Sequence, residues 1–176
     1  MRAVVLLALA TLTACASASS SGNTETVRVS STGATTLGVS TLQDAQRRTI
    51  AAPFADVWRV LPAVLDSLGI PITTRDAATG QVGTTGLEVR RTLGHTMVSR
   101  YFACGNEQDA TSAVSFDLFL TLMVQVQPAP AGGTSLATLT TVRAKPITYS
   151  GGWISCESRG LLEQRIADEV TARTAH

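Results

Sequence analysis

The chain has 176 residues, of which 44% are hydrophobic, 15% charged and 5% aromatic, and this length suits a single domain with a sizeable core. Its 14 basic and 13 acidic residues nearly cancel, and a chain with a single lysine and no basic run is a poor candidate for nucleic-acid binding. The low charge and high apolar fraction also argue against intrinsic disorder.

The N-terminus has the features of an export signal. Met1 and Arg2 provide a minimal positive start, and residues 3–12 are apolar or small, interrupted only by Thr11. A bilayer span needs about 20 apolar residues, so the stretch is too short for a transmembrane helix. It fits the apolar region of a secretory signal.

The residues that follow, Leu12-Thr13-Ala14-Cys15, resemble the lipobox of bacterial lipoproteins. In that family the Cys thiol receives a diacylglyceryl group, a peptidase cuts before the Cys, and the new amino group is usually acylated. The resemblance therefore implies lipid attachment at Cys15 and durable membrane anchoring by two or three acyl chains. Because residue +2 is Ala16 and not Asp, it also implies an outer-membrane location facing the periplasm. The alternative is an ordinary signal peptide in which Cys15 is incidental.

This reading divides the chain into three parts. Residues 1–14 are the signal peptide, and residues 15–26 are the acylated Cys and a flexible tether, because ASASSSGNTET is small and polar without apolar periodicity. Residues 27–176 form one domain, in which alternating Val27 and Val29 predict a short first strand.

The clearest predicted helix covers residues 54–68, after a predicted strand over 47–52. Pro53 suits the first helical position, where its missing N–H costs nothing, and Gly69 suits the residue after the helix end. Pro62 predicts a kink or a split. Seven apolar residues fall on one face of about 120°: Phe54, Val57, Trp58, Leu61, Val64, Leu65 and Leu68.

The middle of the chain reads as a run of strands. We predict strands over 70–74, 81–91 and 96–103, with turns at 76–80 and 93–95. In residues 114–126 every second residue is apolar, which indicates a half-buried strand, although Phe119 and Met123 lie on its otherwise polar face. The segment 128–133 (PAPAGG) then turns the chain into a strand over 135–148, completing an antiparallel hairpin.

A second helix is predicted over residues 160–172. Leu162, Ile166 and Val170 form a narrow apolar stripe on it, and Ser158 can cap its start. Within the preceding strands, Gly83 and Gly86 mark a bulge or a close approach of two backbones.

The segment from Thr49 to Trp58 (TIAAPFADVW) resembles the opening of START-like, or helix-grip, domains. There a first strand ends in Ala-Pro and a helix begins with an acidic residue before Val-Trp. Such domains also occur in the C component of the outer-membrane β-barrel assembly machinery, which is itself a lipoprotein. With the element order, the resemblance implies an α+β fold, in which a curved antiparallel sheet of five to seven strands carries two helices packed on one face.

Two cysteines remain once Cys15 is acylated. An exported chain most often joins such a pair, so we predict a Cys104–Cys156 disulfide between the end of the 96–103 strand and the loop before the last helix. The alternative is a reactive thiol, which needs a nearby histidine or cationic group; His95 is the only internal histidine and falls in a predicted turn.

Residue patterns for catalysis are weak. No nucleophile elbow accompanies His95, and the paired carboxylates Glu107/Asp109 and Asp168/Glu169 read as solvated surface charge. The chain offers too few ligands for a metal centre.

Arg90, Arg91 and Arg100 are predicted on two strands joined by one turn, where two of them can pair across the sheet. They form a candidate anion-facing patch, the alternative being a solvated sheet face.

We therefore expect a membrane-anchored, non-enzymatic lipoprotein with no catalytic residues and no cofactor. Its partner would be an envelope protein or a small apolar ligand in the helix–sheet crevice. The alternative is an envelope enzyme of unknown reaction. A deep apolar pocket favours a ligand, whereas a packed core with an exposed apolar patch favours a protein partner.

Overall fold

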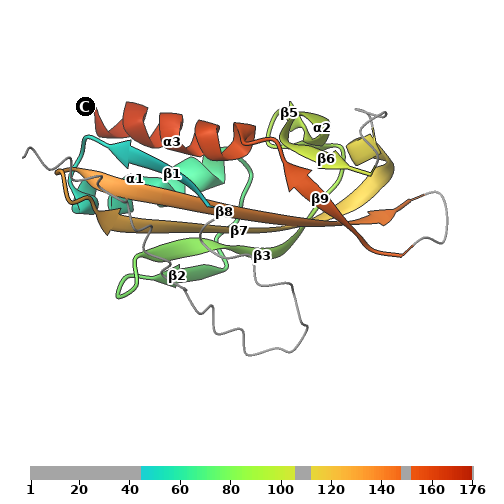
Figure 1. Cartoon of the computed structure of the whole chain (residues 1–176), viewed down its shortest axis with the longest axis horizontal. Helices are drawn as coiled ribbons and strands as arrows, with labels where there is room; N and C mark the ends of the chain where they lie inside the picture. The colour runs from blue at the N-terminus through green and yellow to red at the C-terminus, as the bar shows by residue number, and fades with distance from the viewer. Residues whose placement is uncertain (1–44, 106–111, 148–151, 176) are drawn as a thin grey trace, which may run out of the picture.

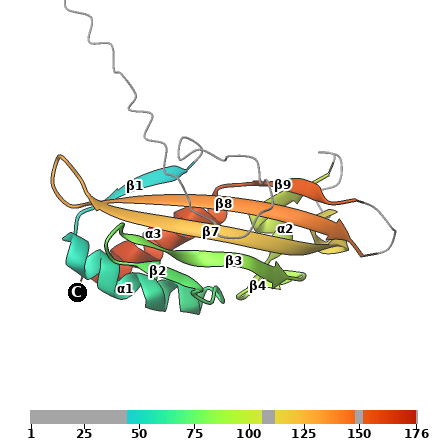
Figure 2. The same ribbon diagram turned by 90° about the horizontal axis from the view of Figure 1, so that it is seen from below.

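The computed structural model describes residues 45–105, 112–147 and 152–175. These residues form an α+β domain in which an antiparallel sheet curves against helices (Figures 1 and 2). The predicted fold class is confirmed, and the helix-grip relationship itself stays a prediction. Cys15, the signal peptide, the tether, Val27 and Val29 lie outside the described residues.

The main sheet has seven strands. In order across the sheet, six of them are β2 (Thr74–Asp76), β3 (Gln81–Val89), β7 (Phe116–Pro128), β8 (Thr134–Pro146), β9 (Ile154–Ser158) and β6 (Phe102–Cys104). The seventh, β1 (Gln46–Ile50), pairs with the first half of β8, on the same side as β9 pairs with the second half. A separate ribbon joins β4 (Thr92–Leu93) to β5 (Thr96–Met97).

The hairpin of β7 and β8 is the centre of the sheet, as the alternation of residues 114–126 predicts. The two strands pair in unbroken register from Phe116↔Pro146 to Pro128↔Thr134. Successive side chains of a strand point to opposite faces, and the even-numbered residues of β7 from Phe116 to Val126 are all buried. Residues 112–115 form a 3-10 turn (η2, Ser112–Ser115) instead of the strand start.

Helices α1 (Phe54–Ser67) and α3 (Leu161–Thr174) cover that buried face together (Figures 1 and 2). The predicted face of α1 is confirmed at Val57, Leu61, Val64, Leu65 and Leu68, all of which are buried. Phe54 and Trp58 differ, because they are only partly buried at the margin of the core. The helix runs through Pro62 as one element, so the predicted split is wrong; Pro62 removes only one hydrogen bond while the buried residues on both sides of it hold the helix against the sheet.

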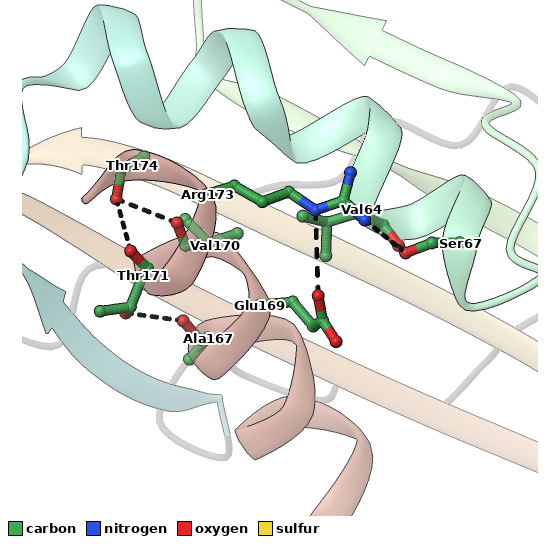
Figure 3. A network of polar contacts seen from close by, with 8 residues as sticks. All are labelled: Val64, Ser67, Ala167, Glu169, Val170, Thr171, Arg173 and Thr174. Carbon is green, nitrogen blue, oxygen red and sulfur yellow. Dashed lines mark hydrogen bonds and ion pairs between the residues drawn. The ribbon is translucent and has the colours of Figure 1, made fainter. Parts of the chain in front are cut away.

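Polar side chains tie the ends of α1 and α3 to each other (Figure 3). Arg173 Nη2 donates to Ser67 Oγ at 3.2 Å, and that hydroxyl donates to the Val64 carbonyl at 2.8 Å. Arg173 Nε also lies 3.8 Å from Glu169 Oε2. The predicted stripe of α3, with Leu162, Ile166 and Val170, is fully buried, so the closing helix is an integral part of the core.

The start of α3 differs from the prediction. Gly160, in a left-handed conformation with φ 77°, is the N-cap residue, and Ser158 does not cap the helix directly. Ser158 Oγ accepts from the Gly160 N–H at 3.1 Å and donates to Glu163 Oε1 at 2.7 Å. The hydroxyl reaches the helix through Glu163, a buried residue of its first turn.

Two predicted strands are wrong in part. The strand expected over 70–74 begins only at Thr74, because Pro71 has no N–H for a sheet hydrogen bond and the fully buried Ile70 anchors the chain after Gly69. The strand expected over 96–103 is interrupted by a short helix, α2 (Val98–Tyr101). One helical turn places Val98 and Tyr101 on the same side, and both are buried.

Candidate functional site

One face of the sheet is free of described helices. α2, α3 and the β4–β5 ribbon lie with α1 on the other side, where Arg165 of α3 donates to Thr96 Oγ1 at 2.8 Å and to Tyr101 Oη at 2.9 Å. We call the opposite surface the open face. Its residues around the centre of the sheet are Thr85, Gly86, Glu88, Phe119, Thr121, Met123, Thr141, Arg143, Trp153 and Ser155.

A hollow of about 210 Å³ lies on the open face. It is lined by Thr85, Gly86, Phe119, Thr121, Thr141, Arg143 and Trp153, which come from β3, β7, β8 and the residue before β9. Pockets for drug-sized ligands measure roughly 300–1,000 Å³. The hollow therefore has the size for one side chain or one ring, and not for a large cofactor.

Aromatic rings form the apolar wall of the hollow. The rings of Phe119 and Trp153 meet edge to face, with centroids 4.8 Å apart and planes at 67°. The Arg143 guanidinium lies 4.8 Å from the centroid of the Trp153 ring, within the range of a cation–π contact. Trp153 is nevertheless 48% exposed, so a large apolar surface is held in place yet open to a partner.

Glycines shape the β3 side of the hollow. The register of β3 against β7 shifts between Thr84 and Leu87, and Gly86 there has a φ of 67°, a combination typical of a β-bulge. The Gly86 N–H points across to Thr121 Oγ1 at 3.4 Å. At Gly83 a Cβ atom would overlap the Leu122 carbonyl oxygen. Both predictions, a bulge and a close backbone approach, are confirmed.

The predicted Cys104–Cys156 disulfide is present. The two residues face each other in the β6–β9 pair, with Cα atoms 4.3 Å apart, the close spacing of a non-hydrogen-bonded antiparallel pair. Cys156 therefore lies in a strand and not in the predicted loop before α3. The bridge joins β9 to β6, the strand at one edge of the sheet, and β9 is the strand that follows Trp153.

The three arginines of the candidate anion-facing patch do not lie on two paired strands. Arg90 follows β3, Arg91 has a left-handed φ of 62°, and Arg100 lies on α2 and not on a strand. The cross-strand partner of Arg90 is Asp117, whose Oδ1 accepts from Arg90 Nε at 2.6 Å. The expectation that two of these arginines pair across one strand pair is wrong, because a helical turn occupies the place of the second strand.

The Arg90–Asp117 contact predicts an acid-sensitive increment of stability. The hydrogen bond from Arg90 holds the pKa of the Asp117 carboxyl below its usual value and raises the pKa of Arg90. A carboxyl whose pKa is lower in the folded than in the unfolded chain stabilises the fold above the unfolded pKa of about 3.9, and this stabilisation is lost as pH falls through the folded pKa. Between about pH 5 and pH 2, the thermal midpoint of Asp117→Asn should therefore decline less than that of the parent. Arg90→Gln should likewise reduce the decline of the thermal midpoint over this pH range. A decline as steep as that of the parent in both variants would contradict the pairing.

The other polar residues singled out in the sequence lie on the surface or outside the described residues. His95 is exposed in the β4–β5 turn, as predicted, and Glu169 contacts Arg173 on α3, beside the exposed Asp168. Glu107 and Asp109 lie outside the described residues. Within residues 45–105, 112–147 and 152–175, no three His, Cys, Asp or Glu side chains are grouped as metal ligands. In the same ranges, no helix combines the length and apolarity that a bilayer crossing requires.

Apolar side chains of the core line the interface between helices and sheet, where the sequence predicts a crevice. Leu118, Leu120 and Leu122 are fully buried within one cluster that includes α1 and α3. The hydroxyls of Thr84 and Thr140 flank Leu122 in the cross-strand row and lack a hydrogen-bond partner.

No protein-family model matches the chain, and no curated protein matches it.

Sequence reasoning missed the hollow. The sequence predicts no strand at β9, so Trp153 has no assigned place, and Arg143 falls within the predicted 135–148 strand without a role. One signal was present: Phe119 breaks the polar face of the 114–126 alternation.

Proposed function

We propose that the chain is a non-enzymatic lipoprotein of the outer membrane, anchored through Cys15 and facing the periplasm, that binds an envelope protein through the open face. The observation that carries the proposal is the exposed Trp153, held by Phe119 and Arg143 beside a packed core. An exposed apolar patch on an otherwise packed domain is typical of a protein-binding surface. Tryptophan and arginine are also the residues most enriched at the energetic centres of interfaces.

The anchor is tested by Cys15→Ser. This change removes the thiol that the lipobox resemblance assigns to acylation, so the protein should move from the membrane fraction to a soluble or uncleaved form. Intact-mass measurement of the parent should give a mature chain that begins at Cys15 and carries acyl groups. A mature N-terminus at any other residue would exclude the lipoprotein assignment.

The binding surface is tested by comparing the two tryptophans of the chain. Trp153→Ala should weaken binding of the envelope partner by about 30-fold or more, as expected for the centre of an interface. Its free energy of unfolding should change by less than about 1 kcal/mol, because half of the side chain is already in water. The partner protein is first identified by cross-linking in cells and then purified. Titration of the full chain with it measures the loss of binding, and urea denaturation measures the change in stability.

Trp58→Ala is the matched control for Trp153→Ala. Trp58 stacks on Phe54 with ring centroids 6.0 Å apart, and the Arg75 guanidinium lies 5.1 Å from the centroid of the Trp58 ring. Both tryptophans therefore make a cation–π contact with an arginine. Trp58 packs against the helix side of the core, and its loss should cost about 2 kcal/mol of stability while partner binding is retained. If Trp153→Ala were destabilising and bound normally, the assignment of the open face would be wrong.

A further inference from the structure

The hollow on the open face carries a positive charge that no described residue neutralises. The ion pairs within the described ranges join Arg59 to Asp56, Arg90 to Asp117 and Arg173 to Glu169. Arg143 takes part in none of them and has Trp153 as its neighbour. On the same face, Arg90 is held by a carboxylate at 2.6 Å, whereas Arg143 is the cation that lines the hollow.

Residues of opposite charge flank the hollow. Glu88, Phe119, Arg143 and Ser155 lie in one cross-strand row. Neighbouring strands are about 4.8 Å apart, so Glu88 and Arg143 are separated by roughly twice that distance, with the Phe119 ring between them. A negative group is attracted at the Arg143 end and repelled at the Glu88 end.

We infer that the hollow receives an apolar or aromatic side chain of the envelope partner, next to a carboxylate that pairs with Arg143. The rings of Phe119 and Trp153 match an apolar group, and a guanidinium forms its strongest hydrogen bonds with carboxylates. The volume of about 210 Å³ suits one side chain of a longer segment, which continues across the remaining open face. This inference rests on the proposed function and specifies the chemistry of its partner.

Short blocked peptides test the inference on the full chain in detergent micelles. Trp58→Phe leaves Trp153 as the only tryptophan, since the chain has two, and its fluorescence then reports on the hollow. N-acetyl-Phe-Glu-amide should change this fluorescence in a saturable way at millimolar concentration. N-acetyl-Phe-Gln-amide and N-acetyl-Ala-Glu-amide should each bind at least tenfold more weakly, because one lacks the charge and the other the ring.

Variants of the two arginines separate the pairing from general charge attraction. Arg143→Gln should abolish the difference between the Glu and Gln peptides, Arg143→Lys should retain part of it, and Arg90→Gln should leave it unchanged. Thermal midpoints within about 2 °C of the parent would show that these variants remain folded. Raising the salt concentration should weaken binding of the Glu peptide more than that of the Gln peptide.

Each of the following results would contradict the inference. Equal binding of the Glu and Gln peptides would exclude a carboxylate partner for Arg143. Binding of 3-phenylpropionate as tight as that of the Phe-Glu peptide would assign the hollow to a free small carboxylate. A fluorescence change that depends on protein concentration, with dimers in sedimentation, would assign the face to a second copy of the chain. If the envelope partner is bound by the open face but independently of Arg143, the inference fails while the proposed function stands.

Discussion

Removing the Cys104–Cys156 bridge should lower the free energy of unfolding by about 4 kcal/mol, the value that the chain-entropy model gives for a bridge between residues 52 apart. The Cys104→Ala/Cys156→Ala double variant is preferred, because it leaves no free thiol at either end of the bridge to form mixed disulfides. Urea denaturation of the full chain, with and without reductant, measures the loss. Reductant should destabilise the parent and leave the double variant unchanged.

The structure also predicts where the bridge acts. β6 and β9 share three register pairs, and β9 is joined to β8 by another three, Val142 to Ala144. A segment with so few sheet contacts is expected to open before the centre of the sheet. In hydrogen exchange, reduction should therefore expose Phe102–Cys104 and Ile154–Ser158 first.

The closing helix should remain protected under the same conditions. Leu162, Ile166 and Val170 of α3 are fully buried, and Arg173 holds the helix end to α1, so the helix does not depend on the disulfide alone. Simultaneous loss of protection in β6, β9, β7 and β8 would contradict this account, since the bridge would then support the whole core.

Leu61→Ala should have the second large effect, a loss of about 2–5 kcal/mol in the free energy of unfolding. Leu61 is 0% exposed in the middle of α1, where a shorter side chain leaves a cavity that the paired strands beneath cannot fill by collapsing. Chemical denaturation measures the loss, with an unchanged slope indicating that the unfolding reaction is the same.

Arg59→Ala is the control on the same helix. The Arg59 side chain is 69% exposed, and its contact with Asp56, at 3.4 Å, is a surface ion pair. Its removal should change stability by less than about 0.5 kcal/mol. Equal losses in the two variants would mean that α1 does not present Leu61 to the sheet.

Local periodicity was sufficient to predict the elements that cross the centre of the domain. The period of two in β7 and the period of 3.6 in α1 arise because one side of each element meets the core, and the buried residues of both follow those patterns. The turn at 128–133 also follows from its own Pro and Gly residues. These features depend on residues close together in the sequence.

The parts that failed depend on contacts between distant segments. α2 forms because Val98 and Tyr101 are both buried in the core. Four residues are too few for the sequence to reveal this helical spacing. β9 is a strand because β8 and β6 flank it, and its own sequence, ISCES, has little apolar alternation. Burial of only part of Trp58 likewise follows from its place at the margin of the sheet beside Arg75.

The hollow could not be predicted for the same reason. Its residues come from four segments between Thr85 and Trp153, and the bulge at Gly86 and the pairing of β8 with β9 bring them together. The disulfide was predictable from the cysteine count together with the predicted export signal. Its position opposite a neighbouring strand, which holds the segment after Trp153 in place, required the structure.

Photo-cross-linking in intact cells tests the central claim, that the open face binds an envelope protein. The photoreactive residue p-benzoylphenylalanine replaces the exposed Thr85 at the edge of the hollow or, as the control, the exposed Asp66 on α1. Position 85 should give an adduct with one envelope protein, identified by mass spectrometry, that disappears when Trp153→Ala is added; position 66 should give none. Adducts from position 66 alone, or from both positions regardless of Trp153, would contradict the account.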